Sequence, residues 1–138
     1  IKIHTNGMFY ERLKTILAQK LVDHVSLDIK NAPSAYAKTC GVEDMDLKDI
    51  EKSLDLLKQS VVPYDICVTL VDELHNQATI EELGQWIQGV DTVILQPFED
   101  SETTIDHSLH RPSFEVVLKY KKIFEKYVKH VKIRGNQA

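Results

Sequence analysis

The chain has 138 residues, about the size of one domain. Its 43% apolar and 28% charged residues can build a buried core, which excludes a disordered or low-complexity chain. Seventeen basic and 21 acidic residues give a formal net charge of −4, which argues against charge-driven binding to nucleic acid or to an anionic membrane.

Five segments are rich in the β-branched and apolar residues that are typical of strands. In chain order they are Ile1–Thr5, Val22–Lys30, Tyr64–Val71, Thr92–Phe98 and His130–Arg134.

Four helices are predicted between these strands from apolar residues at helical spacing. The first carries Tyr10, Leu13, Ile16 and Leu17, and the second, after Asp46 as a predicted N-cap, carries Leu47, Ile50, Leu54 and Leu57. The third opens on a predicted capping box of Thr79 and Glu82 and carries Ile80, Leu83, Trp86 and Ile87. The fourth starts at Pro112-Ser113 and carries Phe114, Val117, Leu118, Phe124 and Val128. This alternation of strand and helix predicts a parallel sheet with right-handed crossovers.

Polar strand faces distinguish the two architectures that have this order, a doubly wound flavodoxin-like sheet and a β/α barrel. A strand covered by helices on both faces is apolar on both, whereas a barrel strand can be polar toward a ligand-filled lumen. Every predicted strand has one polar face, as in the second strand, where Ser26, Asp28 and Lys30 alternate with Val25, Leu27 and Ile29. Burying an unpaired ion in a dry core costs several kcal/mol, so the pattern favours the barrel.

The chain begins at Ile1 rather than Met, already inside a strand pattern. We therefore expect an α/β fold in which residues 1–138 form a single domain, half to two-thirds of a TIM-like β/α barrel of parallel strands with outer helices. Its N-terminal part is expected to lie outside this chain. The first strand, Ile1–Thr5, is then an unpaired edge, which predicts self-association through that strand.

Candidate ligand-binding residues follow two of the strands, where β/α barrels place their functional groups. Thr5, Asn6 and Gly7 offer hydrogen bonds and a close backbone approach to a ligand, or form a simple turn. Asp28 and Lys30 can hold the opposite charges of one zwitterionic ligand, or pair with each other. The pattern leaves both alternatives open.

An ordered set of segments resembles the radical SAM activating enzymes of glycyl radical enzymes. The segments are Thr5-Asn6-Gly7, Leu21–Lys30, Tyr36 with Gly41, Ser53–Leu57, Tyr64–Thr69 and Ile94–Phe98. Within the family, the chain is most similar to activating proteins of anaerobic ribonucleoside-triphosphate reductase, and pyruvate formate-lyase activating enzymes are the near relatives. The ordered set is specific, although none of its segments is.

The resemblance implies an oxidoreductase that uses S-adenosylmethionine and a 4Fe–4S cluster held by three cysteines of a CxxxCxxC loop. Reductive cleavage of S-adenosylmethionine gives a 5′-deoxyadenosyl radical, which abstracts hydrogen from a glycine of the partner, here anaerobic ribonucleotide reductase. An electron donor such as flavodoxin is implied as a second partner. The 138 residues contain neither that loop nor the family's Gly-Gly-Glu segment. We therefore expect no metal ligands in this chain and no activity from it alone.

The resemblance also assigns binding residues one by one. Matched positions in the S-adenosylmethionine site are Thr5, Asp28 and Lys30, those in the adjoining turn are Asn6 and Gly7, and those in the far wall are Gln96 and Phe98. Three positions depart from the pattern that the resemblance implies: His4 stands where the pyruvate formate-lyase branch has Asp, Cys67 where an Arg is expected and Glu99 where a His is expected.

Two alternative functions remain at this point, pyruvate formate-lyase activation and a non-catalytic flavodoxin-like binding domain. A sheet with a central switch point and helices on both faces would support the latter, and sequentially neighbouring strands with outer helices would contradict it. The two cysteines lack CxxC spacing and no apolar stretch is long enough to span a membrane, so we expect a cytoplasmic protein.

Overall fold

The computed structural model describes residues 1–99 and 108–135. Its elements are β1 (Lys2–Thr5), α1 (Tyr10–Ala18), β2 (His24–Asp28), a 3-10 turn (Pro33–Ala35), α2 (Tyr36–Thr39), α3 (Lys48–Gln59), β3 (Tyr64–Leu70), α4 (Gln77–Trp86), β4 (Thr92–Pro97), α5 (Phe114–Glu125) and β5 (His130–Ile133). All five predicted strands are confirmed, with ends that differ by at most a few residues. No described helix is long and apolar enough to cross a lipid bilayer.

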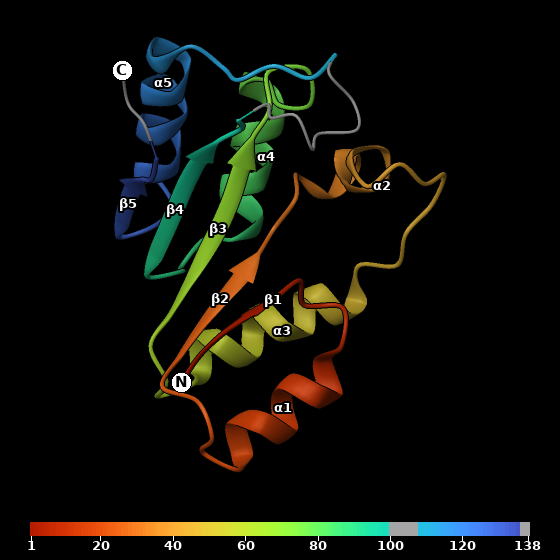
Figure 1. The fold of residues 1–138 in the computed structure, drawn as a ribbon, viewed down its shortest axis with the longest axis vertical. Coiled ribbons are helices and arrows are strands. Elements are labelled where there is room, and N and C mark those ends of the chain that lie inside the picture. Colours follow the sequence, from red (N-terminus) through yellow and green to blue (C-terminus); the bar gives the residue numbers. More distant parts are fainter. Residues whose placement is uncertain (100–107, 136–138) are drawn as a thin grey trace.

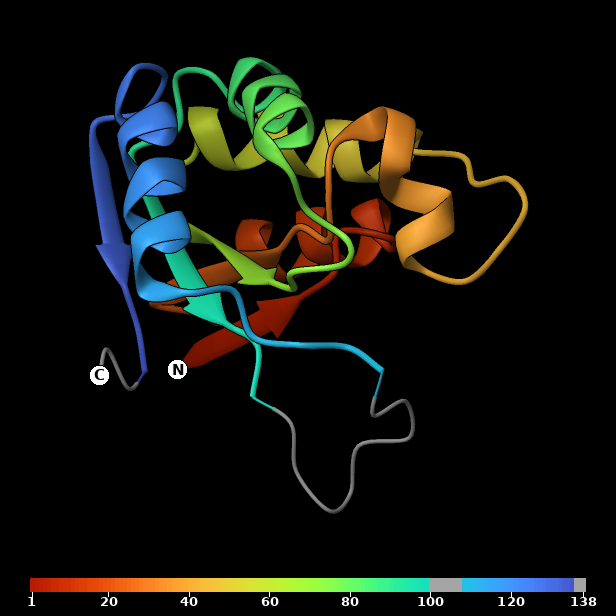
Figure 2. The same cartoon turned by 90° about the horizontal axis from the view of Figure 1, so that it is seen from above.

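The strands form one parallel sheet in the order β1-β2-β3-β4-β5, so every strand lies beside its neighbour in the chain. The described helices α1, α3, α4 and α5 cover one side of this sheet (Figures 1 and 2). This arrangement confirms the partial β/α barrel with outer helices. The flavodoxin-like alternative is wrong, because the described strands have no central switch point in their order.

The hydrophobic core lies between the sheet and its helices. Alternate residues of the inner strands, among them Val25, Leu27, Ile66, Val68 and Leu95, are completely buried there. They pack against buried residues of four helices: Leu13, Ile50, Leu54, Leu57, Ile80, Leu83, Val117 and Phe124. Each fully buried aliphatic side chain stabilises the fold by about 1.5–3 kcal/mol, so this layer fixes the sheet's orientation.

The other face of the sheet is polar, as the alternation predicts. Ser26 and Asp65 lie on it and are buried, while Thr69 and Gln96 lie on it and are exposed. The register places Ser26 beside Asp65 and Thr69 beside Gln96. Polar side chains therefore line the inner, concave side of the partial barrel.

Helix starts differ in part from the prediction. Ser113 is the N-cap of α5 and accepts from the Val116 amide, as expected. For α4 the predicted Thr79–Glu82 box is wrong, because the helix begins three residues earlier and Asn76 forms the capping box with Thr79. Asp46 is also not the cap of α3, since Leu47 occupies that position.

The fourth predicted apolar stripe is correct only in part. Val117, Phe124 and Val128 are buried, but Phe114 and Leu118 are 40% and 39% exposed. Tyr120 of the same helix is buried instead. Its hydroxyl donates to the backbone carbonyl of His75 across 3.2 Å, so its polar group has a partner in the core.

Candidate functional site

The candidate site lies where the parallel strands β1 to β4 end, at one edge of the sheet. Thr5 is the last residue of β1 and pairs with Leu27, so it lies next to the end of β2. Asp28 is the last residue of β2, and Gln96 is the penultimate residue of β4. The fold therefore brings the strand ends that carry the predicted residues to the same edge.

The turn after β1 is tightly fixed. The Gly7 amide donates to Thr5 Oγ1 across 3.1 Å, and the Met8 amide donates to Asn6 Oδ1 across 2.9 Å. Gly7 has a φ of +76°, and a Cβ there would lie 2.9 Å from Leu27 Cδ1, so only glycine fits without strain. The buried hydroxyl of Ser53 donates to the Gly7 carbonyl across 3.1 Å, which ties the turn to α3.

The turn thus keeps some groups for a ligand. The Thr5 hydroxyl accepts one hydrogen bond from Gly7 and still has its proton to donate. Asn6 is exposed, and its amide nitrogen has donors that the turn does not use. The local geometry is compatible both with a simple turn and with a binding turn.

Asp28 and Lys30 form an ion pair in the structure, with Nζ 2.5 Å from Oδ2. Mutual pairing was one of the two alternatives for these residues. Both side chains remain accessible, since Lys30 is 46% and Asp28 is 36% exposed. Exposed ion pairs contribute only about 0–1 kcal/mol, so a zwitterion that offers both charges can replace this contact at little cost.

Gln96 and Phe98 lie at the end of β4. Gln96 is exposed beside Thr69, and Phe98 is half-buried. The Phe98 amide donates to the Leu70 carbonyl across 2.8 Å, so the β4 backbone stays attached to β3 beyond the end of the strand. Glu99, at one of the departures from the family pattern, lies with Oε1 3.6 Å from Arg111 Nη1.

A second polar cluster surrounds Asp65 and was not predicted as a unit. Ser26 Oγ donates to Asp65 Oδ1 across 2.7 Å, His24 Nε2 lies 2.7 Å from Oδ2, and Cys67 Sγ lies 3.3 Å from Oδ1. Burial by itself raises the pKa of Asp65, but the hydrogen bonds from Ser26, His24 and Cys67 outweigh it and hold that pKa below its usual value.

The same cluster affects the pKa of Cys67, another of the positions that depart from the family pattern. Burial, followed by the hydrogen bond to the Asp65 carboxylate, raises the pKa of the Cys67 thiol to about 11. The thiol is therefore protonated and unreactive at neutral pH. The cluster extends along the polar face from His24, the first residue of β2, to Cys67, which pairs with Asp28 in the sheet and so adjoins the candidate site.

Two buried polar residues next to the candidate site were also missed. Asn31 is completely buried, and its Nδ2 donates to the Leu74 carbonyl across 2.7 Å and lies 2.9 Å from Thr39 Oγ1. His75 is 4% exposed, and its Nε2 lies 3.0 Å from the Lys30 carbonyl. The sequence shows both as polar residues outside the predicted strands and helices, but it indicates neither their burial nor their hydrogen-bond partners.

The two cysteines do not form a cluster-binding set. Cys40 is exposed after α2, whereas Cys67 lies on β3, and both are free thiols. In the part of the chain that the structure describes, no three His, Cys, Asp or Glu side chains lie together as metal ligands. The described residues thus do not fit an iron–sulfur cluster, whereas the Asp28–Lys30 pair fits a zwitterion.

Comparison with known proteins supports the family resemblance. No protein-family model matches the chain. A protein of Methanocaldococcus jannaschii, provisionally named a glycyl-radical enzyme activating enzyme, is 27% identical over 139 aligned positions, which cover 97% of this chain and 58% of that protein. The chain thus spans little more than half the length of this relative. The resemblance to activating enzymes of glycyl radical enzymes is confirmed.

A solved structure shows the same fold. The crystal structure of a domain of pyruvate-formate lyase-activating enzyme from Bacteroides vulgatus matches with a TM-score of 0.70 and 17% identity. The match covers 95% of this chain and 79% of that structure. The five-stranded partial barrel is therefore an arrangement that occurs in an activating-enzyme domain.

Proposed function

We propose that this chain carries the S-adenosylmethionine-binding part of a radical SAM enzyme that activates a glycyl radical enzyme. The observation that carries the proposal is the accessible Asp28–Lys30 pair at the end of β2, beside the fixed Thr5–Gly7 turn at the end of β1. The similarity to a relative named for glycyl-radical enzyme activation supports it.

Each residue of the proposed site has a definite role. The Lys30 ammonium binds the carboxylate of the methionyl group, and the Asp28 carboxylate binds a cationic or hydrogen-bond-donating group of the same ligand. Thr5 and Asn6 donate hydrogen bonds, and Gly7 lets the ligand approach the backbone. Gln96 supplies an amide on the far wall, and Phe98 supplies apolar surface there.

The ion pair prepares the site for a ligand of this charge pattern. Because Asp28 and Lys30 already lie 2.5 Å apart, a zwitterion meets one charge of each sign side by side. Neither charge is left uncompensated before binding, and neither is deeply buried, so the exchange of partners needs little desolvation.

We further propose that the ligands of the 4Fe–4S cluster lie outside this chain. The cluster would supply the electron for reductive cleavage of S-adenosylmethionine, and no step of that reaction is assigned to Cys40 or Cys67. Residues 1–138 then form one domain that binds S-adenosylmethionine without cleaving it. If the chain alone, reconstituted anaerobically with iron and sulfide, cleaved S-adenosylmethionine, this part of the proposal would be wrong.

The partner that we propose is anaerobic ribonucleotide reductase, with an electron donor such as flavodoxin in the cytoplasm. His4 stands where the pyruvate formate-lyase branch has Asp, which favours this partner over pyruvate formate-lyase. Formation of a glycyl radical on one purified partner and not on the other, detected by electron paramagnetic resonance with the full activating enzyme, tests the choice.

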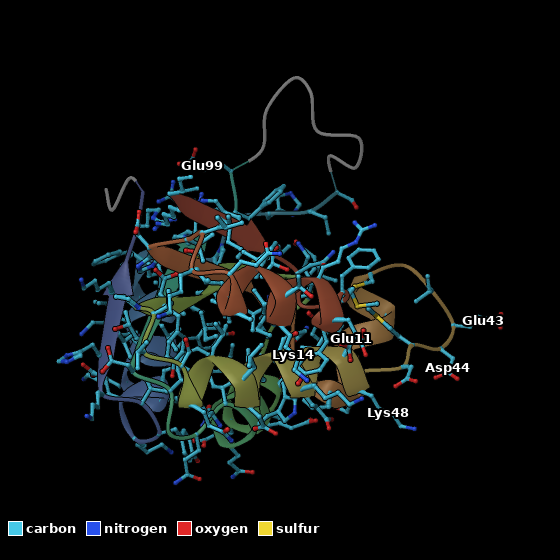
Figure 3. All side chains as sticks on the ribbon, turned by 90° about the horizontal axis from the view of Figure 1, so that it is seen from below. Glu11, Lys14, Glu43, Asp44, Lys48 and Glu99 are labelled. Carbon is cyan, nitrogen blue, oxygen red and sulfur yellow. The ribbon has the colours of Figure 1, made fainter. Side chains whose placement is uncertain are left out.

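The binding site itself is tested by isothermal titration of the 138-residue chain with S-adenosylmethionine. We expect Lys30→Met and Asp28→Asn each to weaken binding about tenfold, because each removes one charged contact. Lys48→Met and Asp44→Asn are matched controls, since both residues are exposed on or before α3 and neither belongs to the proposed site; Figure 3 shows both well away from Glu99, which follows β4. Equal effects of the site and control variants would contradict the proposed site.

A further inference from the structure

The backbone of Lys30 is held from both sides by buried side chains. Its amide donates to the hydroxyl of Tyr36 across 3.1 Å, and its carbonyl lies 3.0 Å from Nε2 of His75. Tyr36 is 1% and His75 is 4% exposed, so neither side chain can move without disturbing the core. Lys30 itself lies beyond the end of β2, where the sheet no longer fixes the chain.

The surroundings of His75 determine which ring nitrogen carries the proton. Nδ1 lies 3.1 Å from the Val71 amide, which can only donate, so Nδ1 accepts. The Val71 carbonyl, 3.2 Å from Nδ1, already accepts from the Leu74 and His75 amides. The proton therefore lies on Nε2, which donates to the Lys30 carbonyl.

His75 thus joins the segments that follow two neighbouring strands. Val71 is the residue after β3, and Lys30 is two residues after β2. A neighbouring contact reinforces this link, because Asn31 Nδ2 donates to the Leu74 carbonyl across 2.7 Å. The two loops are therefore connected by hydrogen bonds at the point from which the Lys30 side chain projects.

Tyr36 makes the equivalent contact on the amide side of Lys30. The short helix α2 begins at Tyr36, and the Tyr36 ring packs edge-on against Trp86 of α4, with ring centroids 6.1 Å apart. The Tyr36 hydroxyl is therefore placed by a contact with the outer helix layer. Through the Tyr36 hydroxyl, the helix layer fixes the position of Lys30, which follows the end of β2.

We propose that Tyr36 and His75 are positioning residues that hold Lys30 so that its ammonium group stays beside Asp28 and faces the ligand. The inference rests on the proposed function, because it assumes that Lys30 binds the ligand. A lysine on a fixed backbone loses less freedom on binding than one on a mobile loop, and that saving appears as affinity.

The test uses two tyrosines that differ in what their hydroxyls contact. Tyr36→Phe removes the acceptor of the Lys30 amide, whereas Tyr127→Phe removes a half-buried hydroxyl that donates to Glu81 of α4. By titration of the 138-residue chain with S-adenosylmethionine, we expect Tyr36→Phe to weaken binding about fivefold and Tyr127→Phe to stay within about twofold of the unaltered chain. Thermal unfolding of each variant confirms that it is folded.

A double-mutant cycle shows whether the effect passes through Lys30. In the Lys30→Met background, Tyr36→Phe is expected to have no further effect on affinity, because the side chain that it positions is gone. His75→Gln keeps a donor and an acceptor and is expected to bind more tightly than His75→Leu, which has neither. A merely structural role would give the same loss in both backgrounds and no rescue by Gln.

The outcomes separate this inference from the proposed function. If Lys30→Met binds like the unaltered chain, the proposed site is wrong and the inference is overturned with it. If Lys30→Met loses affinity but Tyr36→Phe matches Tyr127→Phe, the site stands and the inference alone is overturned. Additive losses in the cycle would also overturn it, since Tyr36 would then act independently of Lys30.

Discussion

A Cβ placed on Gly84 would lie 2.5 Å from Cδ2 of the Tyr127 ring, so this ring lies directly against the backbone of α4. The Tyr127 hydroxyl donates to Glu81 Oε2 across 2.6 Å, one turn earlier on the same helix. Lys126 binds the other oxygen of Glu81 across 2.5 Å. Tyr127 and Lys126 follow α5 directly, so Gly84 and Glu81 set how closely α4 and α5 pack.

Gly84→Ala is therefore expected to destabilise the protein by about 1–3 kcal/mol, although alanine is the better helix former. Chemical denaturation measures the change in the free energy of unfolding. In a Tyr127→Ala background the same substitution is expected to be neutral or stabilising, because nothing then opposes the new methyl group. An equal loss in both backgrounds would show that the contact with Tyr127 is not the cause.

The Asp65 cluster predicts a loss of stability in acid. Because hydrogen bonds hold the pKa of Asp65 below its usual value of 3.8, the folded state favours the carboxylate. This contribution is fully present above pH 3.8 and is lost as the pH falls through the lower pKa of the folded state. Asp65→Asn is expected to cost about 1–3 kcal/mol at pH 7 and less in acid. Urea unfolding of both proteins from pH 2 to 7 measures the difference, and a difference independent of pH would contradict the prediction.

The two thiols are expected to differ in reactivity. Cys67 has a pKa raised to about 11, whereas Cys40 lies exposed after α2. Iodoacetamide at pH 8 is expected to alkylate Cys40 first, and Cys67 in a Cys40→Ser background is expected to react slowly, faster as the pH approaches 11. Asp65→Asn removes a negative charge from beside Cys67 and is expected to accelerate its alkylation at pH 8. An unchanged rate would mean that Asp65 does not influence the thiol.

The outer edge of β1 is expected to mediate self-association. Within residues 1–99 and 108–135, β1 pairs only with β2, so its other edge presents unpaired amide and carbonyl groups. Ile1 and Phe9 near this edge are 75% and 60% exposed. Light scattering at increasing concentration is expected to show dimers or larger species, and His4→Pro, which removes an N–H on the outer side of β1, is expected to reduce them. A strictly monomeric chain at high concentration would contradict this prediction.

The arrangement of the sheet could be predicted because it depends on a local pattern. Polar residues such as Ser26 and Asp28 alternate with the buried Val25 and Leu27, and this alternation survives in the structure. The α4 capping box could not be identified with certainty, because Asn76-Thr79 and Thr79-Glu82 both fit the motif. Glu82 instead binds the amide of Ser34 across 3.0 Å, a contact between residues 48 positions apart.

In the candidate site, too, contacts between residues close in the chain could be predicted, whereas contacts between distant residues could not. Asp28 and Lys30 could be paired from the sequence, because residues two apart in an extended segment point to one side. The contact of His75 with Lys30 joins residues 45 positions apart, and no local pattern indicates it. The Ser26–Asp65 bond likewise depends on the register between β2 and β3, which the alternation alone leaves open.

Because each described strand pairs only with the strands next to it in the chain, the sheet has a middle and two ends rather than a closed ring. Amide protons of β3, which has β2 and β4 as partners, should exchange with solvent only during global unfolding, whereas those of β1 and β5 should exchange through smaller openings. The strand ends that carry the proposed site extend across both the easily opened and the stable parts of the sheet. Thr5 belongs to the part that opens easily and Gln96 to the part that does not, so ligand binding should slow amide exchange most at β1.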